Sequence, residues 1–258
     1  MMLKKQLSKT FKLIRKRKKV FLLLLLLQFI FFVSLTITGY STVVPFAGKA
    51  QSVFSYVNTM KLDSKGLDLG EDPLQLYHDY KDALKYLKIF AIIVAVICLT
   101  LNNVIWGLAN HLYKKMNVKE FMKYFLNYLI IKVSAGLILF FLSVKLLKNL
   151  FETEGIFSNA EFVVLMILLI AVVYMMFVFI SAIRKQKIMD VVDKGLKNTI
   201  KLPVFLAFII NALLMIFVFA LFYWLGELSL IIVFILIALL VLVFSWTKLF
   251  MITMSESV

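Results

Sequence analysis

A basic segment followed at once by a long apolar segment opens the chain and constrains how the rest can fold. Residues 1–19 hold nine Lys or Arg and no Asp or Glu, and the apolar run 20–38 follows directly. A segment this basic is costly to move across a bilayer, so it should stay in the cytoplasm and fix the direction of each later crossing. The run 20–38 is longer than a typical signal-peptide core and no small-residue cleavage site follows, which favours an uncleaved anchor over a cleaved signal.

The remaining composition indicates a membrane protein. Hydrophobic residues make up 63% of the 258 residues, charged residues 17%, and the mean hydropathy is +0.98. Each crossing needs ~20 apolar residues, and runs of that kind occur at 20–38, 87–108, 124–148, 161–183, 203–225 and 228–250. We therefore predict an all-α, polytopic membrane helix bundle with six transmembrane helices and basic amphipathic interfacial helices. A six-helix membrane domain, 20–258, follows the basic cytoplasmic amphipathic segment 1–19.

The distribution of Lys and Arg predicts the orientation. If residues 1–19 are inside, the inner segments carry 20 Lys or Arg and the outer segments carry 7. This ratio predicts a multi-pass protein of the cell membrane with the N-terminus and C-terminus cytoplasmic. The net charge of +15 lies mainly beside apolar runs, so we interpret it as facing anionic membrane lipids and expect no nucleic acid partner.

The extracytoplasmic loop at 40–85 is the only long polar stretch. We expect one short helix at about 48–60 and a second that begins at Asp72-Pro73, where Asp can cap and Pro can take the first helical position. No helix breaker follows Pro73, so the second helix should continue into the next crossing. Turns are expected at 63–66 and at Gly70.

Basic amphipathic segments precede three of the crossings. The first lies within 1–19, the second precedes 124, and the third spans 188–201, where Asp190 with Lys194 and Asp193 with Lys197 favour a helix. Pro203 should mark the start of the following crossing. Residues 7–13 and 196–202 are similar, which a triplicated hairpin or simple convergence of Lys-rich and Leu-rich sequence would both explain.

Few residues within the crossings could carry chemistry. The candidate membrane-embedded polar positions are Gln28, Asn102, Asn103, Lys132 and Asn211. They could line a path for a polar substrate, or they could form hydrogen bonds between helices, which is the more common role of such groups. Lys132 is the charged candidate for a deep position, and its side chain could bind an anionic partner or extend to the membrane interface.

The chain resembles a loose class of prokaryotic six-helix membrane proteins without assigned activity. The class includes the membrane domain attached to some glycerophosphodiester phosphodiesterases. The resemblance rests on residues 195–203, the hairpin that follows and residues 244–250, and it covers mainly 190–254. It implies a helical membrane fold, and it does not imply phosphodiesterase activity because no catalytic domain of that kind is present.

Two functions from different classes agree with these features. The first is an integral membrane accessory or scaffold protein that engages membrane lipids or other membrane proteins. The second is a transporter or channel for a small or amphipathic substrate. We expect no enzymatic activity, no cofactor and no metal site, because the sequence contains none of the motifs for metal ligation, phosphate binding or nucleophilic catalysis. The five polar positions distinguish the two functions: convergence on a hydrated cavity favours transport, and dispersal into helix contacts favours a scaffold.

Overall fold

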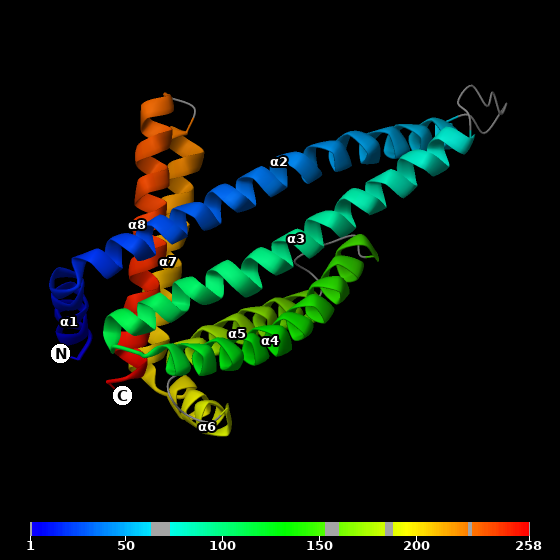
Figure 1. Ribbon diagram of the computed structural model, residues 1–258. Coiled ribbons are helices and arrows are strands. Elements are labelled where there is room, and N and C mark those ends of the chain that lie inside the picture. The colour runs from blue at the N-terminus through cyan, green and yellow to red at the C-terminus, as the bar shows by residue number, and fades with distance from the viewer. Residues whose placement is uncertain (1, 63–72, 153–159, 184–187, 227–228, 258) are drawn as a thin grey trace. The chain divides into compact units, whose positions relative to one another are not determined.

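The described part of the chain is built from helices. The computed structural model describes all residues except 1, 63–72, 153–159, 184–187, 227–228 and 258 (Figure 1). Its helices are α1 (Met2–Lys16), α2 (Lys18–Leu62), α3 (Pro73–Tyr113), α4 (Val118–Glu152), α5 (Ala160–Ala182), α6 (Ile188–Thr199), α7 (Leu202–Leu225) and α8 (Leu230–Ser255). Six of them, α2 to α5, α7 and α8, are long and apolar enough to cross a membrane. The predicted all-α polytopic fold is confirmed, and the chain is a multi-pass membrane protein.

The chain divides into two compact units. Unit 1 comprises residues 1–28 and 103–258, and unit 2 comprises residues 29–102. The helix α2 therefore begins in unit 1 and ends in unit 2, whereas α3 begins in unit 2 and ends in unit 1.

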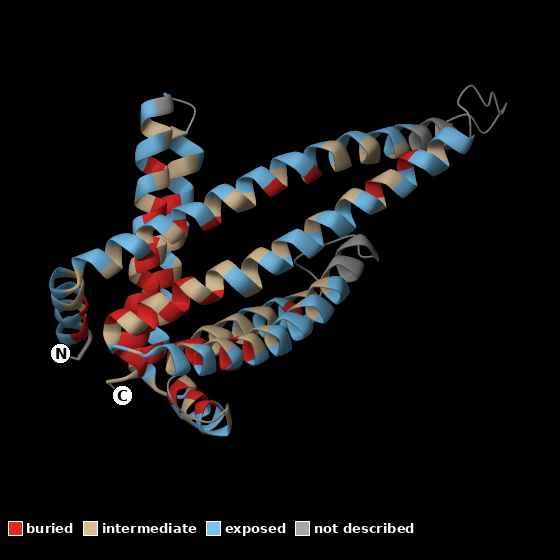
Figure 2. Cartoon of the chain, viewed as in Figure 1, coloured by how far each residue is buried: buried red, intermediate tan, exposed pale blue. Residues whose placement is uncertain are grey.

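The C-terminal half of α8 forms the centre of unit 1. Residues 247–255 are all buried, and α1, α5 and α7 pack against α8 (Figure 2). The last apolar run predicted from the sequence ends at 250, whereas α8 ends at Ser255. The helix continues to Ser255 because the apolar stretch from Leu249 to Ile252 is buried among the neighbouring helices.

Local capping interactions set the helix ends of unit 1. At the start of α4, Asn117 Oδ1 accepts from the Glu120 N–H at 2.9 Å and Glu120 Oε2 accepts from the Asn117 N–H at 3.1 Å. This reciprocal pair is a capping box, which satisfies donors that a helix leaves free at its N-terminus. Pro203 stands in the first turn of α7, as predicted, and Ser229 Oγ caps α8 by accepting from the Ile232 N–H.

Unit 2 contains the part of α2 after Gln28 and the part of α3 up to Asn102. The helix α2 runs through residues 40–47 without a break, so the separate helix expected at 48–60 is part of α2. Pro45 lies inside α2, where it removes one backbone hydrogen bond and the residues on either side continue the helix. The helix α3 begins at Pro73 and continues to Tyr113, which confirms the predicted continuity, and the turns expected at 63–66 and Gly70 lie outside the described residues.

One ion pair joins the two helices of unit 2. Lys49 Nζ lies 2.7 Å from Asp79 Oδ1, and the Asp79 side chain is largely buried. Ala83, one helical turn after Asp79, is also buried. The pair therefore connects α2 with the face of α3 that packs inside unit 2.

Two of the three predicted basic amphipathic segments form separate helices, α1 and α6. The segment expected at 188–201 forms α6, and the Asp193–Lys197 ion pair is confirmed at 2.7 Å. The helix α1 ends at Lys16 and α2 begins at Lys18, so the single residue Arg17 separates them. The basic segment that precedes 124 is continuous with α4 and forms no separate helix.

Candidate functional site

A buried lysine within the membrane-spanning part of unit 1 is the main feature of the candidate site. Lys248 of α8 is only 5% exposed, and its Nζ donates a hydrogen bond to Gln28 Oε1 of α2. The same Nζ lies 5.9 Å from the ring centroid of Phe244, one turn earlier on α8. Among the described residues, no carboxylate forms an ion pair with Lys248. This amino group therefore relies on an amide oxygen and an aromatic face.

Lys132 of α4 belongs to the same region. It is close enough to Lys248 for the two charges to repel each other. Its Nζ also lies 5.7 Å from the ring centroid of Tyr128, a cation–π distance. Tyr128 is fully buried beside Tyr124, with 6.3 Å between the two ring centroids. Lys132 therefore adds a second positive charge to the electrostatic environment of Lys248.

Asn103 links α3 to α4. Its Nδ2 donates to the Phe125 carbonyl at 3.1 Å, and the residue is fully buried. This hydrogen bond joins two of the membrane-crossing helices within unit 1.

Hydrogen-bond donors exceed acceptors around Lys248. The buried Gln28 Nε2 has no partner within the described residues, and neither does the buried Ser245 Oγ, one turn before Lys248. A hydroxyl can donate or accept, whereas the Lys amino group and the amide NH₂ donate. Buried polar groups in native proteins are nearly always hydrogen-bonded, so an acceptor-rich or anionic group would complement this site.

The remaining predicted positions lie elsewhere. Asn211 is buried on α7, and neither its Oδ1 nor its Nδ2 has a partner within the described residues. Asn102 is partly exposed on α3, at the last position of unit 2. Of the five candidate positions, Gln28 bonds to Lys248, Lys132 acts on Lys248 only through its charge, and Asn103 bonds to α4. Asn102 and Asn211 form no hydrogen bond with Gln28, Asn103, Lys132 or Lys248.

Lys248 is the functional candidate that sequence reasoning missed. It stands near the end of the last apolar run, 228–250, and is not among the five predicted positions. A usable signal was present in the sequence, because the apolar residues Leu249 to Ile252 follow it and continue the helix. A lysine between two apolar stretches is a candidate for burial.

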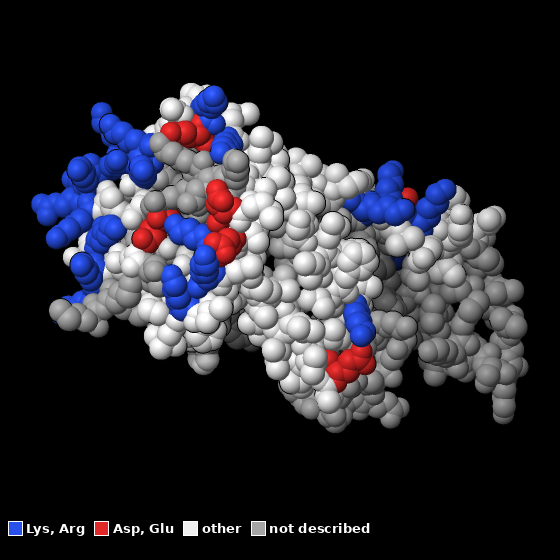
Figure 3. Space-filling view, turned by 90° about the horizontal axis from the view of Figure 1, so that it is seen from below, with Lys and Arg blue, Asp and Glu red and all other residues white. Residues whose placement is uncertain are grey.

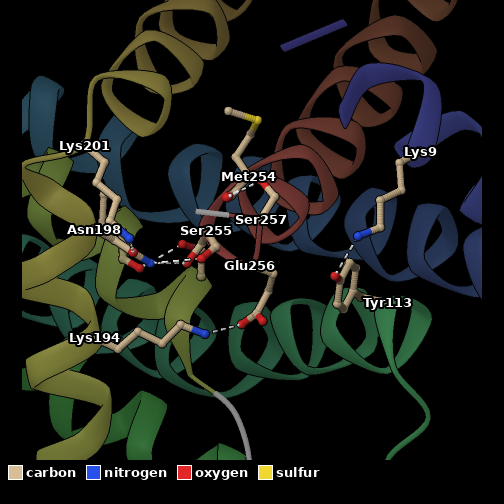
Figure 4. Close-up of polar contacts among 11 residues, drawn as sticks. Lys9, Tyr113, Lys194, Asn198, Lys201, Met254, Ser255, Glu256 and Ser257 are labelled. Carbon is tan, nitrogen blue, oxygen red and sulfur yellow. Dashed lines mark hydrogen bonds and ion pairs between the residues drawn. The ribbon is translucent and has the colours of Figure 1, made fainter. Parts of the chain in front are cut away.

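A second polar region occupies the end of unit 1 that carries α1, α6 and the turn between α3 and α4, which we call the basic end. Lys9 of α1 donates to the Tyr113 hydroxyl at 3.0 Å, and Lys194 of α6 pairs with Glu256 at 2.8 Å (Figure 4). Thr10 and Thr253 share a hydrogen bond of 2.9 Å between buried hydroxyls. These contacts attach α1 to α3 and α8, and α6 to the residue that follows α8.

Asn198 forms two hydrogen bonds that join α6 to the end of α8. Its Nδ2 donates to both the carbonyl and the hydroxyl oxygen of Ser255, at 3.0 and 2.9 Å, and both residues are buried. Lys201 in turn donates to Asn198 Oδ1. Sequence reasoning identified the α6 helix but not this contact, because Asn198 and Ser255 are 57 positions apart in the chain.

Positive charge dominates the basic end. Figure 3 shows Lys and Arg side chains gathered over this end, with acidic side chains among them.

Comparisons of the chain with protein-family models, with curated proteins and with solved structures each find no match.

Proposed function

We propose that this multi-pass membrane protein is an accessory or scaffold protein that engages anionic membrane lipids, and through them or directly other membrane proteins. The observation that carries the proposal is the attachment of α1 and α6 to the end of α8. Hydrogen bonds fix α1 and α6 there, and an ion pair adds to the attachment of α6. The exposed Lys and Arg groups of α1 are therefore presented in a defined arrangement. Basic segments beside a membrane crossing attract anionic lipid by ~1 kcal/mol per Lys or Arg near the surface.

The intramembrane polar residues also support a scaffold. Asn103 bonds to the backbone of α4, and Gln28 bonds to Lys248 of α8. Both side chains are therefore used between helices, which is the usual role of uncharged polar residues in a membrane bundle. These contacts support a stable helix arrangement that can present a surface to lipids or partner proteins.

Native mass spectrometry tests the lipid part of the proposal. The full chain, purified in mild detergent, is titrated with phosphatidylglycerol and, separately, with phosphatidylcholine of the same chain length. We expect binding of the anionic lipid to be about tenfold tighter at low ionic strength, with the preference reduced in high salt because exposed charges are screened. Equal affinity for the two lipids at low salt would contradict the proposal.

Purification from the native membrane tests the scaffold part. A stoichiometric membrane protein that stays bound in mild detergent, and that is released when the charges of α1 are neutralised, is the expected result. A particle that contains only this chain and a defined small molecule would contradict the scaffold role and favour transport.

A transporter or channel for a small or amphipathic substrate is the second candidate, and Lys248 is the observation that favours it. Ionisable residues inside a membrane bundle commonly mark substrate or ion pathways. Lys248 and Lys132 together would attract the anionic group of an amphipathic molecule. If this candidate is correct, an anionic small molecule should copurify with the wild-type chain and should be lost in Lys248→Met at normal expression.

A further inference from the structure

A pocket lies where α1 meets α2 and the end of α3. It has a volume of about 410 Å³ and is lined by Arg15, Lys16, Arg17, Lys18, Lys19, Val20, His111 and Lys115. Ligand pockets in proteins commonly have volumes of roughly 300–1,000 Å³. The lining contains several basic side chains and no carboxylate. Its shape and charge therefore suit a compact anion.

Arg17 connects the turn between α1 and α2 to the end of α3. Its Nη1 donates to the carbonyls of His111 and Leu112, at 2.6 and 3.0 Å, so it satisfies two carbonyls at the end of α3. The Arg17 backbone continues both helices, since its N–H bonds to the Leu13 carbonyl and its carbonyl accepts from the Phe21 N–H, both at 3.1 Å. The neighbouring Lys and Arg side chains are consequently carried on a fixed turn.

His111 can add a neutral donor to the pocket. Its Nδ1 accepts from the Met116 N–H at 3.1 Å. In the neutral ring, the proton then belongs to Nε2, which is free to donate to a ligand. Arg17 uses Nη1 for both of its carbonyl bonds, so Nε and Nη2 remain as donors. Guanidinium donors match phosphate oxygens in pairs, and lysines add point charges.

The position of the pocket points to a lipid. It lies at the junction of a basic amphipathic helix with a membrane-crossing helix, which is the level of lipid head groups. Directly after Val20, α2 exposes Leu22, Leu23 and Leu26, at 63%, 45% and 54%. Acyl chains could follow these leucines while the phosphate remains in the pocket.

We propose that this pocket binds the phosphate group of an anionic membrane phospholipid. The inference rests on the proposed function, because it assigns one specific site to the lipid binding of the basic end. Arg15, Lys16, Lys18 and Lys19 supply charge from the turn that Arg17 positions, and Lys115 adds charge from the segment after α3.

The experiment is native mass spectrometry of the full chain in mild detergent with three probes: dioctanoyl phosphatidic acid, dioctanoyl phosphatidylcholine and inorganic phosphate. The pocket variant is Lys19→Gln with Lys115→Gln, since both residues are exposed and their replacement should not disturb folding. The matched control is Lys4→Gln with Lys5→Gln, which removes the same charge from exposed positions of α1 outside the pocket. Arg15→Gln with Lys16→Gln is a second pocket variant.

We expect phosphatidic acid to bind the wild-type chain at least about tenfold more tightly than phosphatidylcholine does. Each pocket variant should lose about tenfold in affinity for phosphatidic acid, and the control should change by less than about threefold. Both pocket variants should elute as the wild-type chain does in size-exclusion chromatography.

Three results would overturn the inference, each in a different way. Equal losses in the pocket variants and the control would mean that the whole basic end binds lipid, so the pocket is rejected and the proposed function stands. No preference for phosphatidic acid in the wild-type chain would reject the proposed lipid binding as well. Displacement of the lipid by inorganic phosphate at a similar concentration would identify a soluble phosphate compound as the ligand.

Discussion

The Lys248 amino group is buried in the packed C-terminal half of α8, where it donates a hydrogen bond to the Gln28 side chain. A polar group buried without a hydrogen bond costs several kcal/mol, and a buried charge costs more. The amide oxygen of Gln28 and the nearby ring of Phe244 reduce this cost. Loss of the Gln28 side chain alone should therefore destabilise unit 1 more than loss of both side chains.

A double-mutant cycle tests this dependence. Gln28→Leu removes the acceptor and leaves the Lys248 amino group buried, so we expect it to destabilise the protein by ~1.5–3 kcal/mol. Lys248→Met removes the amino group itself and should cost less, because an apolar side chain of similar length replaces it. Thermal unfolding in detergent, followed by size-exclusion chromatography, measures each variant.

The double variant, Gln28→Leu with Lys248→Met, should be more stable than Gln28→Leu alone, because no unpaired amino group remains. Purely additive effects of the two substitutions would show that the hydrogen bond does not couple these residues.

Gly195 permits a close contact between α5 and α6. A methyl group at this position would lie 1.8 Å from Cδ1 of the Phe179 ring. We predict that Gly195→Ala forces the ring to move and lowers stability by ~1–3 kcal/mol. Gly136→Ala in α4 is the control, since nothing lies within 4 Å of its added methyl group and Ala favours a helix by ~0.5–1 kcal/mol. A Gly195→Ala chain with the thermal stability of the control would show that the ring adapts without cost.

At the scale of elements, the short helix α6 depends on tertiary contacts. Isolated helices shorter than ~12–15 residues are marginal in water, and α6 has 12 residues. The buried Asn198–Ser255 bonds and the Lys194–Glu256 ion pair hold it against the end of α8. These contacts keep α6 in place.

We predict that Asn198→Leu loosens α6. Amide hydrogen exchange across residues 188–199 should become at least about tenfold faster, because the buried contact to Ser255 is lost. Asp193→Asn is the control: it removes the exposed pair with Lys197, and exposed pairs contribute only ~0.2–1 kcal/mol. If exchange in α6 responds equally to the two substitutions, Asn198 is not its anchor.

For the whole molecule, helix length relates the fold to the bilayer. The helices α2 and α3 contain 45 and 41 residues. At ~1.5 Å per residue each is ~60–68 Å long, about twice the ~30 Å of a hydrocarbon core. The ends of α2 and α3 nearest the 63–72 segment should therefore extend beyond the hydrocarbon.

We predict that both termini face the cytoplasm and that Ser52 lies on the opposite side of the membrane. Single cysteines at Lys5, Ser52 and Ser257, each in a Cys98→Ala chain, are exposed to a membrane-impermeant maleimide in intact cells. The cysteine at position 52 should react at once, and those at positions 5 and 257 only after the cells are opened. The reverse labelling pattern would invert the orientation that the positive-inside rule predicts.

Much of the fold followed from the sequence alone. Runs of apolar residues predicted all the crossing helices, because each must satisfy its backbone hydrogen bonds internally within lipid. Pro73, Pro203 and the amphipathic spacing of 188–201 placed three helix starts correctly. These features are local, so a few neighbouring residues are sufficient to decide them.

The tertiary structure decided what the sequence left open. Pro45 could have ended a helix, yet α2 continues through it, and the packing of α8 buries Lys248, which was not among the predicted positions. The contacts of Gln28 with Lys248 and of Asn198 with Ser255 join residues far apart in the chain. Local sequence determines which segments form helices, whereas the side chains that meet depend on how those helices pack, since each contact requires two segments to reach the same place.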